Sequence, residues 1–322
     1  MSKPRKPRQP TDSVPEILPL HETHSRVILV TGIKKDGTGE AICRRLTLDG
    51  HRVVVLERDK TGQEAAEEIR AAGGNILFLR GNADDEKCVA KLMGTIQCRF
   101  GRLDAVICNA GSAGHSPGKD NILDTDTARS RELWQANFES ARVVTRAALT
   151  SFFLPQREGR ASPPISATTT LSNRPSVIYF GTTTGQAGDP GQLAYGAAKC
   201  GLSALNRHLA AEYGRTVRSF LLRPGTVETN SANWQERRAK HPQYAQIEAE
   251  KTPIGMLAKP DNIAALVLFL LRPEADFLVG QELTCDGGVS ATGVILPEGA
   301  SSSRDAFVDL VVRLKQQGKA VA

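Results

Sequence analysis

The sequence contains no apolar run approaching the ~20 residues that a helix needs to cross a bilayer. The strongest candidate, residues 263–271, is too short and lies inside a helical pattern. The six cysteines include no C-x-x-C pair, and no group of His and Cys has the spacing of a zinc site. We therefore expect a protein of the cytoplasm, where thiols stay reduced, with neither a structural metal nor a membrane partner.

Net charge is small, and most of it lies at one end of the chain. The formal charge is +6, and four basic residues between positions 3 and 8 account for four of these charges in a Pro-rich stretch, which leaves +2 for the rest. Because no basic stripe continues into the body, we expect a disordered tail over residues 1–24 and no nucleic-acid partner. Hydrophobic residues make up 40% of the chain, enough for a sizeable core.

From residue 26 onward, short β-branched runs alternate with longer amphipathic stretches. The short runs are apolar without strict alternation, which is typical of strands buried on both faces of a parallel sheet. The repeated order of strand and helix predicts an α/β fold with one doubly wound, Rossmann-type sheet. Strands are expected at residues 26–31, 52–57, 75–79, 103–108, 176–181, 217–222 and 282–285, and helices at 40–49, 61–72, 85–100, 127–153, 193–214 and 260–271.

The Rossmann-type domain is expected to be a single unit over residues 25–290. Within it, residues 156–175 are rich in Ser, Thr and Pro and predict a surface insertion. Residues 226–259 are polar and irregular, with short helical pieces. Residues 291–322 are expected to be an extension with one helix, whose start has the spacing of a capping box.

Three glycines, Gly32, Gly37 and Gly39, follow the first predicted strand and lead directly into a helix. A phosphate-binding turn needs glycines because its backbone turns tightly and comes close to a pyrophosphate. The free N–H groups at the helix start then favour the negative phosphates. Any tight strand-to-helix turn can use glycine, so it is the position in the first strand–helix unit that favours a dinucleotide site.

Glu57 ends the second predicted strand, where a carboxylate can accept hydrogen bonds from the ribose hydroxyls of an adenosine. The same carboxylate repels a 2′-phosphate, so it favours NAD over NADP. The cations Arg58, Lys34 and Lys35 keep NADP open as the alternative. Glu57 also has a plainer interpretation, as a surface acid at a strand end.

Tyr195 and Lys199 lie four residues apart near the start of a predicted helix and therefore share one helical face. Lowering the pKa of a tyrosine from ~10 to ~7 takes about 4 kcal/mol. A cation at ~4 Å supplies about 1 kcal/mol in water and about 4 kcal/mol at an effective dielectric constant near 20. The pair therefore acts as an acid and base only in a partly desolvated cleft; otherwise Tyr195 is a packing residue beside a surface lysine.

Together these motifs resemble the short-chain dehydrogenase/reductase family, in its compact single-domain branch. The resemblance covers residues 26–288 and rests on motifs that occur in the family's order. They are the glycine turn, Asn109-Ala110-Gly111, Asn137, Thr182 ahead of Tyr195 and Lys199, Pro224-Gly225 through Thr229, and Gly280 followed by Asp286-Gly287-Gly288. The resemblance implies an NAD(P)-dependent oxidoreductase that transfers a hydride between a nicotinamide and an alcohol or carbonyl substrate, in a homodimer or homotetramer.

The resemblance also implies a role for each matching residue. Tyr195 is expected to be the general acid in reduction and the base in oxidation. Lys199 is expected to bind the nicotinamide ribose and to lower the tyrosine pKa, while Thr182 holds a carbonyl oxygen. Asn137 is expected to position a water that relays protons to solvent. The implied cofactor-binding residues are Gly32, Gly37, Thr38, Gly39, Glu57, Asn82, Ala83, Asn109, Ala110, Gly111, Tyr195, Lys199, Pro224, Gly225, Val227 and Thr229.

Three positions depart from the family pattern. Four residues, rather than the usual three, separate Gly32 from Gly37. Thr182 stands where the family has a serine, and Asn82 stands where it has an aspartate. The longer turn and the threonine keep an alternative function open, in which the chain binds a cofactor without turnover, as a scaffold or redox sensor.

The resemblance also implies a lid over the substrate at residues 226–259, which carries two aromatic residues, Trp234 and Tyr244. They occupy the family's substrate-loop position, so they either contact substrate or pack beneath a mobile lid.

Overall fold

A computed structural model describes residues 25–112, 120–154, 174–183, 191–230 and 232–291, with the side chains of residues 232 and 233 left out. The predicted N-terminal tail, nearly all of the predicted insertion and the predicted C-terminal helix lie outside these residues. Within the described part of the chain, no helix combines the length and apolar character needed to cross a membrane.

A seven-stranded sheet forms the centre of the described domain, in the order β3-β2-β1-β4-β5-β6-β7. Every neighbouring pair of strands is parallel, which confirms the doubly wound α/β fold. The strands are β1 (Val27–Thr31), β2 (Arg52–Glu57), β3 (Ile76–Arg80), β4 (Ala105–Cys108), β5 (Ser176–Phe180), β6 (Arg218–Pro224) and β7 (Glu282–Cys285).

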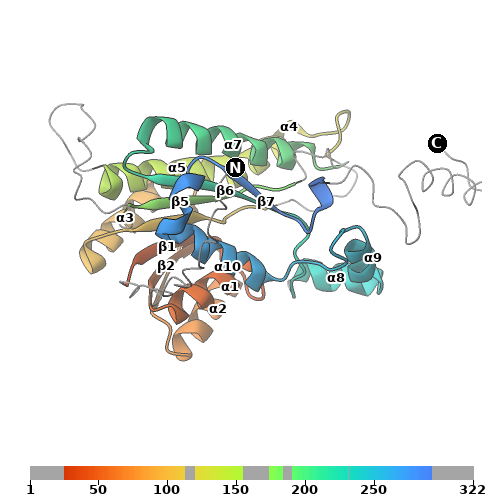
Figure 1. Cartoon of the computed structure of the whole chain (residues 1–322), viewed down its shortest axis with the longest axis horizontal. Coiled ribbons are helices and arrows are strands. Elements are labelled where there is room, and N and C mark those ends of the chain that lie inside the picture. The colour runs from red at the N-terminus through yellow and green to blue at the C-terminus, as the bar shows by residue number, and fades with distance from the viewer. Residues whose placement is uncertain (1–24, 113–119, 155–173, 184–190, 231, 292–322) are drawn as a thin grey trace, which may run out of the picture.

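Helices cover both faces of the sheet (Figure 1). One face is covered by α1 (Thr38–Leu48), α2 (Lys60–Ala71) and α10 (Pro260–Leu271), and the other by α3 (Glu86–Phe100), α5 (Ser140–Ala148) and α7 (Leu193–Tyr213). The remaining elements are α4 (Thr127–Trp134), the π-helical turns η1 (Gln135–Glu139) and η2 (Leu149–Phe153), α8 (Ala232–Lys240), α9 (Tyr244–Glu250) and the 3₁₀ turns η4 (Pro273–Leu278) and η5 (Val289–Ala291).

The inner strands are buried on both sides, as their unbroken apolar runs predict. In β1, Val27 and Leu29 pack on the face of α3, α5 and α7, while Ile28 and Val30 pack on the opposite face. All four side chains are fully buried. Because each strand supplies alternate side chains to two cores, the sheet is held rigidly between two helical layers.

Aspartate side chains cap the starts of α2 and α3. Asp59 caps α2 by accepting a hydrogen bond from the Thr61 N–H, and Asp85 caps α3 by accepting from the N–H groups of Lys87 and Cys88. These caps satisfy N–H groups that have no partner inside the helix.

The predicted helical stretch over residues 127–153 is confirmed, but it is not α-helical throughout, because one π-helical turn interrupts it and a second ends it. The first, η1, separates α4 from α5, and the second, η2, follows α5. A π turn inserts an extra residue into the α-helical ladder and is frequent at functional sites. The sequence gives only a weak local signal of a π turn, because the amphipathic periodicity of the helix continues through it. Here η1 contains Asn137, one of the predicted catalytic residues.

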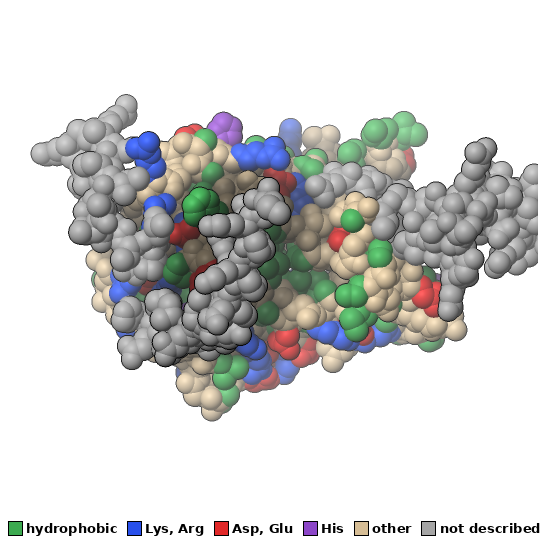
Figure 2. Space-filling view, viewed as in Figure 1, with side chains coloured by type: hydrophobic (Ala, Val, Ile, Leu, Met, Phe, Trp, Pro, Cys, Tyr) green, Lys and Arg blue, Asp and Glu red, His purple; other side chains and the backbone are tan. Residues whose placement is uncertain are grey.

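Charged side chains of both signs are interspersed over the face shown in Figure 2, in keeping with the small net charge of the chain. Several charged side chains of the described residues form ion pairs, such as Arg102 with Asp104 and Arg129 with Glu132.

At the edge opposite the carboxyl ends of the strands, Arg218 is buried with no exposed surface. Its guanidinium donates to the carbonyls of Leu271 and Arg272 at 2.9 and 2.7 Å, and to Asp276 Oδ1 at 3.0 Å. It also donates to Ser176 Oγ at 2.8 Å. One side chain therefore joins β6, β5 and the segment after α10.

We expect Arg218→Met to lower the free energy of unfolding by about 3–5 kcal/mol, because it leaves the buried carboxylate of Asp276 without its cationic partner. Urea unfolding of the two proteins measures the difference. Arg207→Met, at a side chain that is 70% exposed, is the matched control and is expected to change little. A loss for Arg218→Met no larger than that of the control would contradict this prediction.

Candidate active site

The glycine turn brings the ends of β1 and β4 into backbone contact. A Cβ atom on Gly32 would lie 2.5 Å from Ala110 Cα, and Gly32 has a φ of +80°. A Cβ on Gly39 would lie 2.2 Å from the carbonyl oxygen of Gly32. No side chain fits at either position, so α1 starts directly against the end of β1.

The glycine turn, with its one additional residue, is closed by hydrogen bonds. The Gly37 N–H donates to the Lys34 carbonyl at 3.1 Å, and Asp36 adopts a φ of +58°. The carboxylate of Glu40, in the first turn of α1, accepts a hydrogen bond from the Asp36 N–H at 2.6 Å. No side chain caps the start of α1 at Gly37, so its first N–H groups remain available to an anion.

Glu57 lies at the end of β2, beside this turn. Its Oε1 accepts hydrogen bonds from the N–H groups of Arg58 and Asp59 at 2.7 and 2.9 Å. A Cβ on Gly62 would lie 2.6 Å from Glu57 Cγ, so the start of α2 packs closely on this side chain. The carboxylate is thereby held in one orientation. Beyond the end of the neighbouring strand β3, Asn82 is exposed and Ala83 is buried.

Two cations near the glycine turn are paired with carboxylates. Lys35 Nζ lies 2.5 Å from Glu68 Oε1, and Arg44 contacts both Glu40 and Glu68, at 2.5 and 3.1 Å. The pKa of Lys35 is raised by its hydrogen bond to Glu68. Glu68, on α2, therefore compensates the positive charge on this side of the turn.

The Asn109-Ala110-Gly111 segment joins the glycine turn to the centre of the site. Asn109 Nδ2 donates to the Gly32 carbonyl at 2.5 Å, and the Ala110 N–H donates to Thr31 Oγ1 at 3.3 Å. A Cβ on Gly111 would lie 2.5 Å from Asn137 Oδ1 and 3.0 Å from Lys199 Nζ. The segment therefore contacts β1 at one end and two predicted catalytic side chains at the other.

Asn137 is 1% exposed and holds the backbone after β4 in place. Its Nδ2 donates to the carbonyls of Ser112 and Leu133 at 2.9 and 2.8 Å, and its Oδ1 accepts from the Ser112 N–H at 3.1 Å. The π turn η1 thus directs an amide toward Gly111 and Ser112. Sequence reasoning missed Ser112 because its contribution is made by backbone atoms.

Lys199 is a buried cation at the centre of the site, with 5% of its surface exposed. Its Nζ donates to the Phe180 carbonyl at the end of β5, at 2.8 Å. Burial lowers the pKa of Lys199 to about 8, and the nearby Cys108 thiol acts in the opposite direction. Neither the Phe180 carbonyl nor Cys108 was predicted: strand pairing alone brings the ends of β4 and β5 together beneath this lysine.

Tyr195 and Thr182 meet just beyond the end of β5, and Tyr195 lies one helical turn before Lys199 on α7. Burial raises the pKa of Tyr195 above its usual value, and a hydrogen bond with the Thr182 side chain opposes that rise. Thr182 therefore places its hydroxyl where the family's serine would be expected to place one, and Tyr195 is a protonated donor at neutral pH.

The segment after β6 lies over the glycine turn. Gly225 accepts no Cβ without a clash, since that atom would lie 2.7 Å from Asp286 Cβ after β7. Val227 forms an isolated bridge with Ala258. One residue beyond Thr229, the Asn230 N–H donates to the Asp36 carbonyl at 3.3 Å, which links the base of the lid to the turn.

The two lid aromatics pack on each other. Trp234, in α8, is 7% exposed, and its ring meets that of Tyr244 in α9 edge to face at a centroid distance of 5.3 Å. Arg238 lies over the Trp234 ring at 5.8 Å. These contacts give Trp234 a packing role within the lid.

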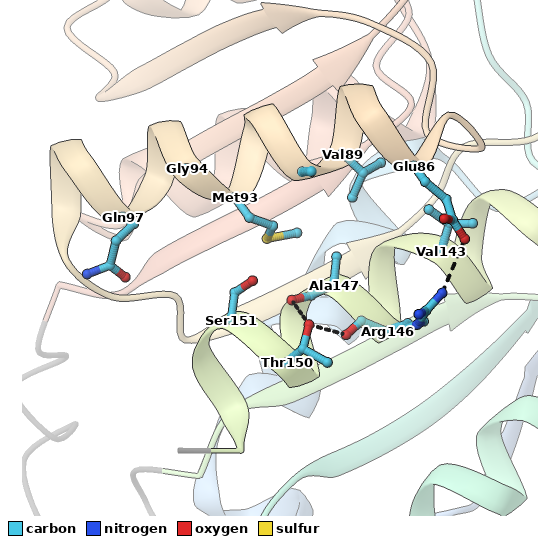
Figure 3. Close-up of a pocket in the computed structure, with 11 residues that line it drawn as sticks. Glu86, Val89, Met93, Gly94, Gln97, Val143, Arg146, Ala147, Thr150 and Ser151 are labelled. Atoms are coloured by element: carbon cyan, nitrogen blue, oxygen red, sulfur yellow. Dashed lines mark hydrogen bonds and ion pairs between the residues drawn. The ribbon is translucent and has the colours of Figure 1, made fainter. Parts of the chain in front are cut away.

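A groove of about 540 Å³ lies on another part of the surface, between α3 and α5 (Figure 3). Met93, Gly94 and Ala147 are among its lining residues, and an ion pair between Glu86 and Arg146 closes one end. It contains none of the predicted site residues.

The structure thus gathers the predicted residues at the carboxyl ends of neighbouring strands. The strand order of the sheet reverses between β1 and β4, which lie at this place. This is where open parallel sheets bind their ligands. The uncapped start of α1, the close backbone approach at Gly32 and the oriented Glu57 carboxylate fit a dinucleotide. Tyr195, Lys199, Thr182 and Asn137 lie together at the other end of the same edge.

Comparison with known proteins agrees with this geometry. Residues 32–290 match the family described as enoyl-(acyl carrier protein) reductase. The chain is 27% identical to cis-4-hydroxycyclohexanecarboxylate dehydrogenase of Sinomonas cyclohexanicum, over 83% of this chain and 97% of the relative. It is 28% identical to the 3-oxoacyl-[acyl-carrier-protein] reductase of Escherichia coli K12, over 82% and 97%.

A solved structure shares the fold. A point variant of actinorhodin polyketide ketoreductase with NADPH superposes with a TM-score of 0.71 at 24% identity, covering 83% of this chain and 98% of that one. With a family match over most of its length, the chain belongs to the enoyl-(acyl carrier protein) reductase family of short-chain dehydrogenases/reductases.

Proposed function

We propose that this protein is an NAD-dependent oxidoreductase that interconverts a small alcohol and the corresponding carbonyl compound, with Tyr195 as the general acid and base. The observation that carries the proposal is that the Tyr195 hydroxyl meets the Thr182 side chain, while Lys199, one helical turn further along α7, is buried against the carbonyl at the end of β5. The relatives named as dehydrogenases and reductases of hydroxyl and oxo groups support the same reaction class.

Each residue has a distinct task in this reaction. Thr182 donates a hydrogen bond to the substrate oxygen, and Tyr195 donates its proton to that oxygen in reduction or removes it in oxidation. Lys199 supplies the positive charge that favours the tyrosinate form. When bound, the nicotinamide accepts or supplies the hydride. Asn137 keeps the backbone at Ser112 fixed, and its Oδ1 retains a second lone pair for a water.

The electrostatics of the turn favour NAD. Glu57 presents an oriented carboxylate at the end of β2, and Glu68 pairs with two of the cations beside the turn, Lys35 and Arg44. Lys34 and Arg58 are exposed and keep NADP as the alternative. The residues that would hold the dinucleotide are those of the glycine turn, Glu57, the segment after β4 and the segment after β6.

We also propose a cytoplasmic homodimer or homotetramer that pairs through α4, α5 and α7. Leu193 and Trp134 support this face, because they are 45% and 40% exposed although they are apolar. The Trp134 ring stacks on Phe138 at 4.5 Å, and both rings lie against Gly201 of α7.

The alternative, cofactor binding without turnover, was motivated by the longer glycine turn and by Thr182. The turn closes with regular hydrogen bonds, and the Thr182 side chain reaches Tyr195. No contact among the described residues favours this alternative over the enzyme.

We expect Tyr195→Phe to lower kcat for alcohol oxidation by about 10²–10⁴-fold, because it removes the proton acceptor. Stopped-flow measurement of NADH formation tests this, with NAD binding followed separately and expected to persist. Tyr213→Phe, at the far end of the same helix, is the matched control. Equal rates in Tyr195→Phe and its parent would sink the proposed mechanism.

We expect NAD to raise the Tm of the protein more than NADP at equal concentration, with about 2.7 kcal/mol of stabilisation at ~100 times the dissociation constant. Glu68→Gln frees Lys35, while Arg44 keeps its pair with Glu40, and is expected to increase the response to NADP. Glu67→Gln, at the exposed neighbouring position, is the control. A larger response of the parent protein to NADP would overturn the preference.

The buried Lys199 makes stability depend on pH. Its folded pKa of about 8 lies below its unfolded value of ~10.4, so the charged lysine destabilises the folded state fully below pH 8. The cost fades as pH rises toward the unfolded pKa. We expect Lys199→Met to have the higher Tm at about pH 7, by a margin that shrinks toward about pH 9.5. The exposed Lys91→Met serves as control, and a margin that grows with pH would refute the assignment.

A further inference from the structure

Arg223 is a buried cation beside the active site that the reaction described above does not use. It lies on β6 immediately before Pro224, and only 4% of its surface is exposed. A buried charge is costly unless it is paired and hydrogen-bonded, so its presence in a strand that is otherwise largely apolar calls for a physical reason.

The guanidinium is held by two other elements. Its Nε donates to Glu282 Oε2 on β7 at 2.9 Å, and Nη2 donates to the same carboxylate. Nη2 also donates to Ser203 Oγ on α7 at 2.7 Å. Because Leu221 pairs with Glu282 in the sheet, Arg223 lies on the same face of the sheet as Glu282, diagonally across the two strands.

The remaining nitrogen faces the catalytic end of β5. Arg223 Nη1 donates to the Thr182 carbonyl at 3.5 Å, and the Arg223 Cγ atom would lie 3.3 Å from a Cβ on Gly181. The stem of Arg223 therefore packs against the residue before Thr182, while its head binds Thr182 itself. Rotation of this peptide would move the hydroxyl that meets Tyr195.

The same guanidinium also contacts the helix that carries the acid and base. Ser203 lies four residues after Lys199, on the same face of α7. Arg223 thus fixes the end of β5 relative to α7, which are the two elements that supply Thr182 and Tyr195.

We propose that Arg223, anchored by Glu282, is a positioning residue that holds Thr182 in register with Tyr195. Only the kinetic consequence of this role of Arg223 rests on the proposed function. Its structural consequence, the hydrogen bond between Thr182 and Tyr195, exists without any substrate. An arginine suits the task because its planar fork reaches three elements at once, which a lysine cannot do.

The test compares Arg223→Met, Arg223→Lys and Glu282→Gln in the full chain. The readout is the ionisation of Tyr195, measured from tyrosinate absorbance after a rapid pH jump and isolated by subtracting the same titration in a Tyr195→Phe background. The chain has four tyrosines, so the subtraction has to remove the tyrosinate signal of only the few other phenols. Two other groups near Tyr195 are the same in every variant. They are the Lys199 ammonium and the Asp120 carboxylate, which accepts a hydrogen bond from the Ala194 N–H at the start of α7.

In Arg223→Met we expect Tyr195 to ionise about one pH unit higher, because it loses the hydrogen bond that stabilises tyrosinate. The kcat for alcohol oxidation is expected to fall about tenfold, with KM for NAD unchanged. Arg223→Lys is expected to recover part of both effects, and Glu282→Gln to show a smaller loss. Arg207→Gln, which removes the partner on the outer side of Glu282, is the control.

Either of two results overturns the proposal: a folded Arg223→Met variant that ionises Tyr195 at the parent pH, or an Arg207→Gln control with the same shift. If Arg223→Met does not fold, Arg223→Lys and Glu282→Gln decide by the same criterion. Failure of the parent to oxidise any alcohol would count against the proposed function alone, because the titration needs no turnover.

Discussion

The contact between the backbones of Gly32 and Ala110 is the constraint on which the site depends. It brings the turns after β1 and β4 so close that no Cβ fits between them. Asn109 then reaches the Gly32 carbonyl, and Gly111 comes against Asn137 and Lys199. The residues proposed to bind a dinucleotide and the predicted acid–base residues are therefore joined in one rigid unit through three consecutive residues after β4.

Within that unit, the central electrostatic feature is a cation kept out of water. Lys199 is held by a carbonyl at the end of β5 and has no carboxylate partner among the described residues. Its burial lowers its own pKa, and the burial of Tyr195 raises the pKa of the phenol. A protonated tyrosine and a desolvated cation thus lie one helical turn apart on α7, and burying the cation costs stability.

The departures from the family pattern are accommodated by side chains of this particular chain. Glu40 binds the N–H of the additional turn residue, Asp36, and keeps the start of α1 open. Arg223 and Glu282 form a buried pair behind Thr182, where a threonine has less rotational freedom than a serine. The contacts of Glu40 and Arg223 therefore hold the longer glycine turn and the Thr182 backbone in place.

The sequence by itself determined the order of strands and helices, because apolar runs and glycine turns are local signals of burial and backbone geometry. It also pointed to Tyr195, Lys199, Thr182 and Asn137 through the order of its motifs, and the fold brings these four residues together. It did not reveal the π turn at Asn137, the Phe180 carbonyl beneath Lys199, or the link from Arg223 to Thr182. These depend on backbone atoms and on pairs up to 59 residues apart, such as Arg223 with Glu282, whose proximity is decided only when parallel strands align in the sheet.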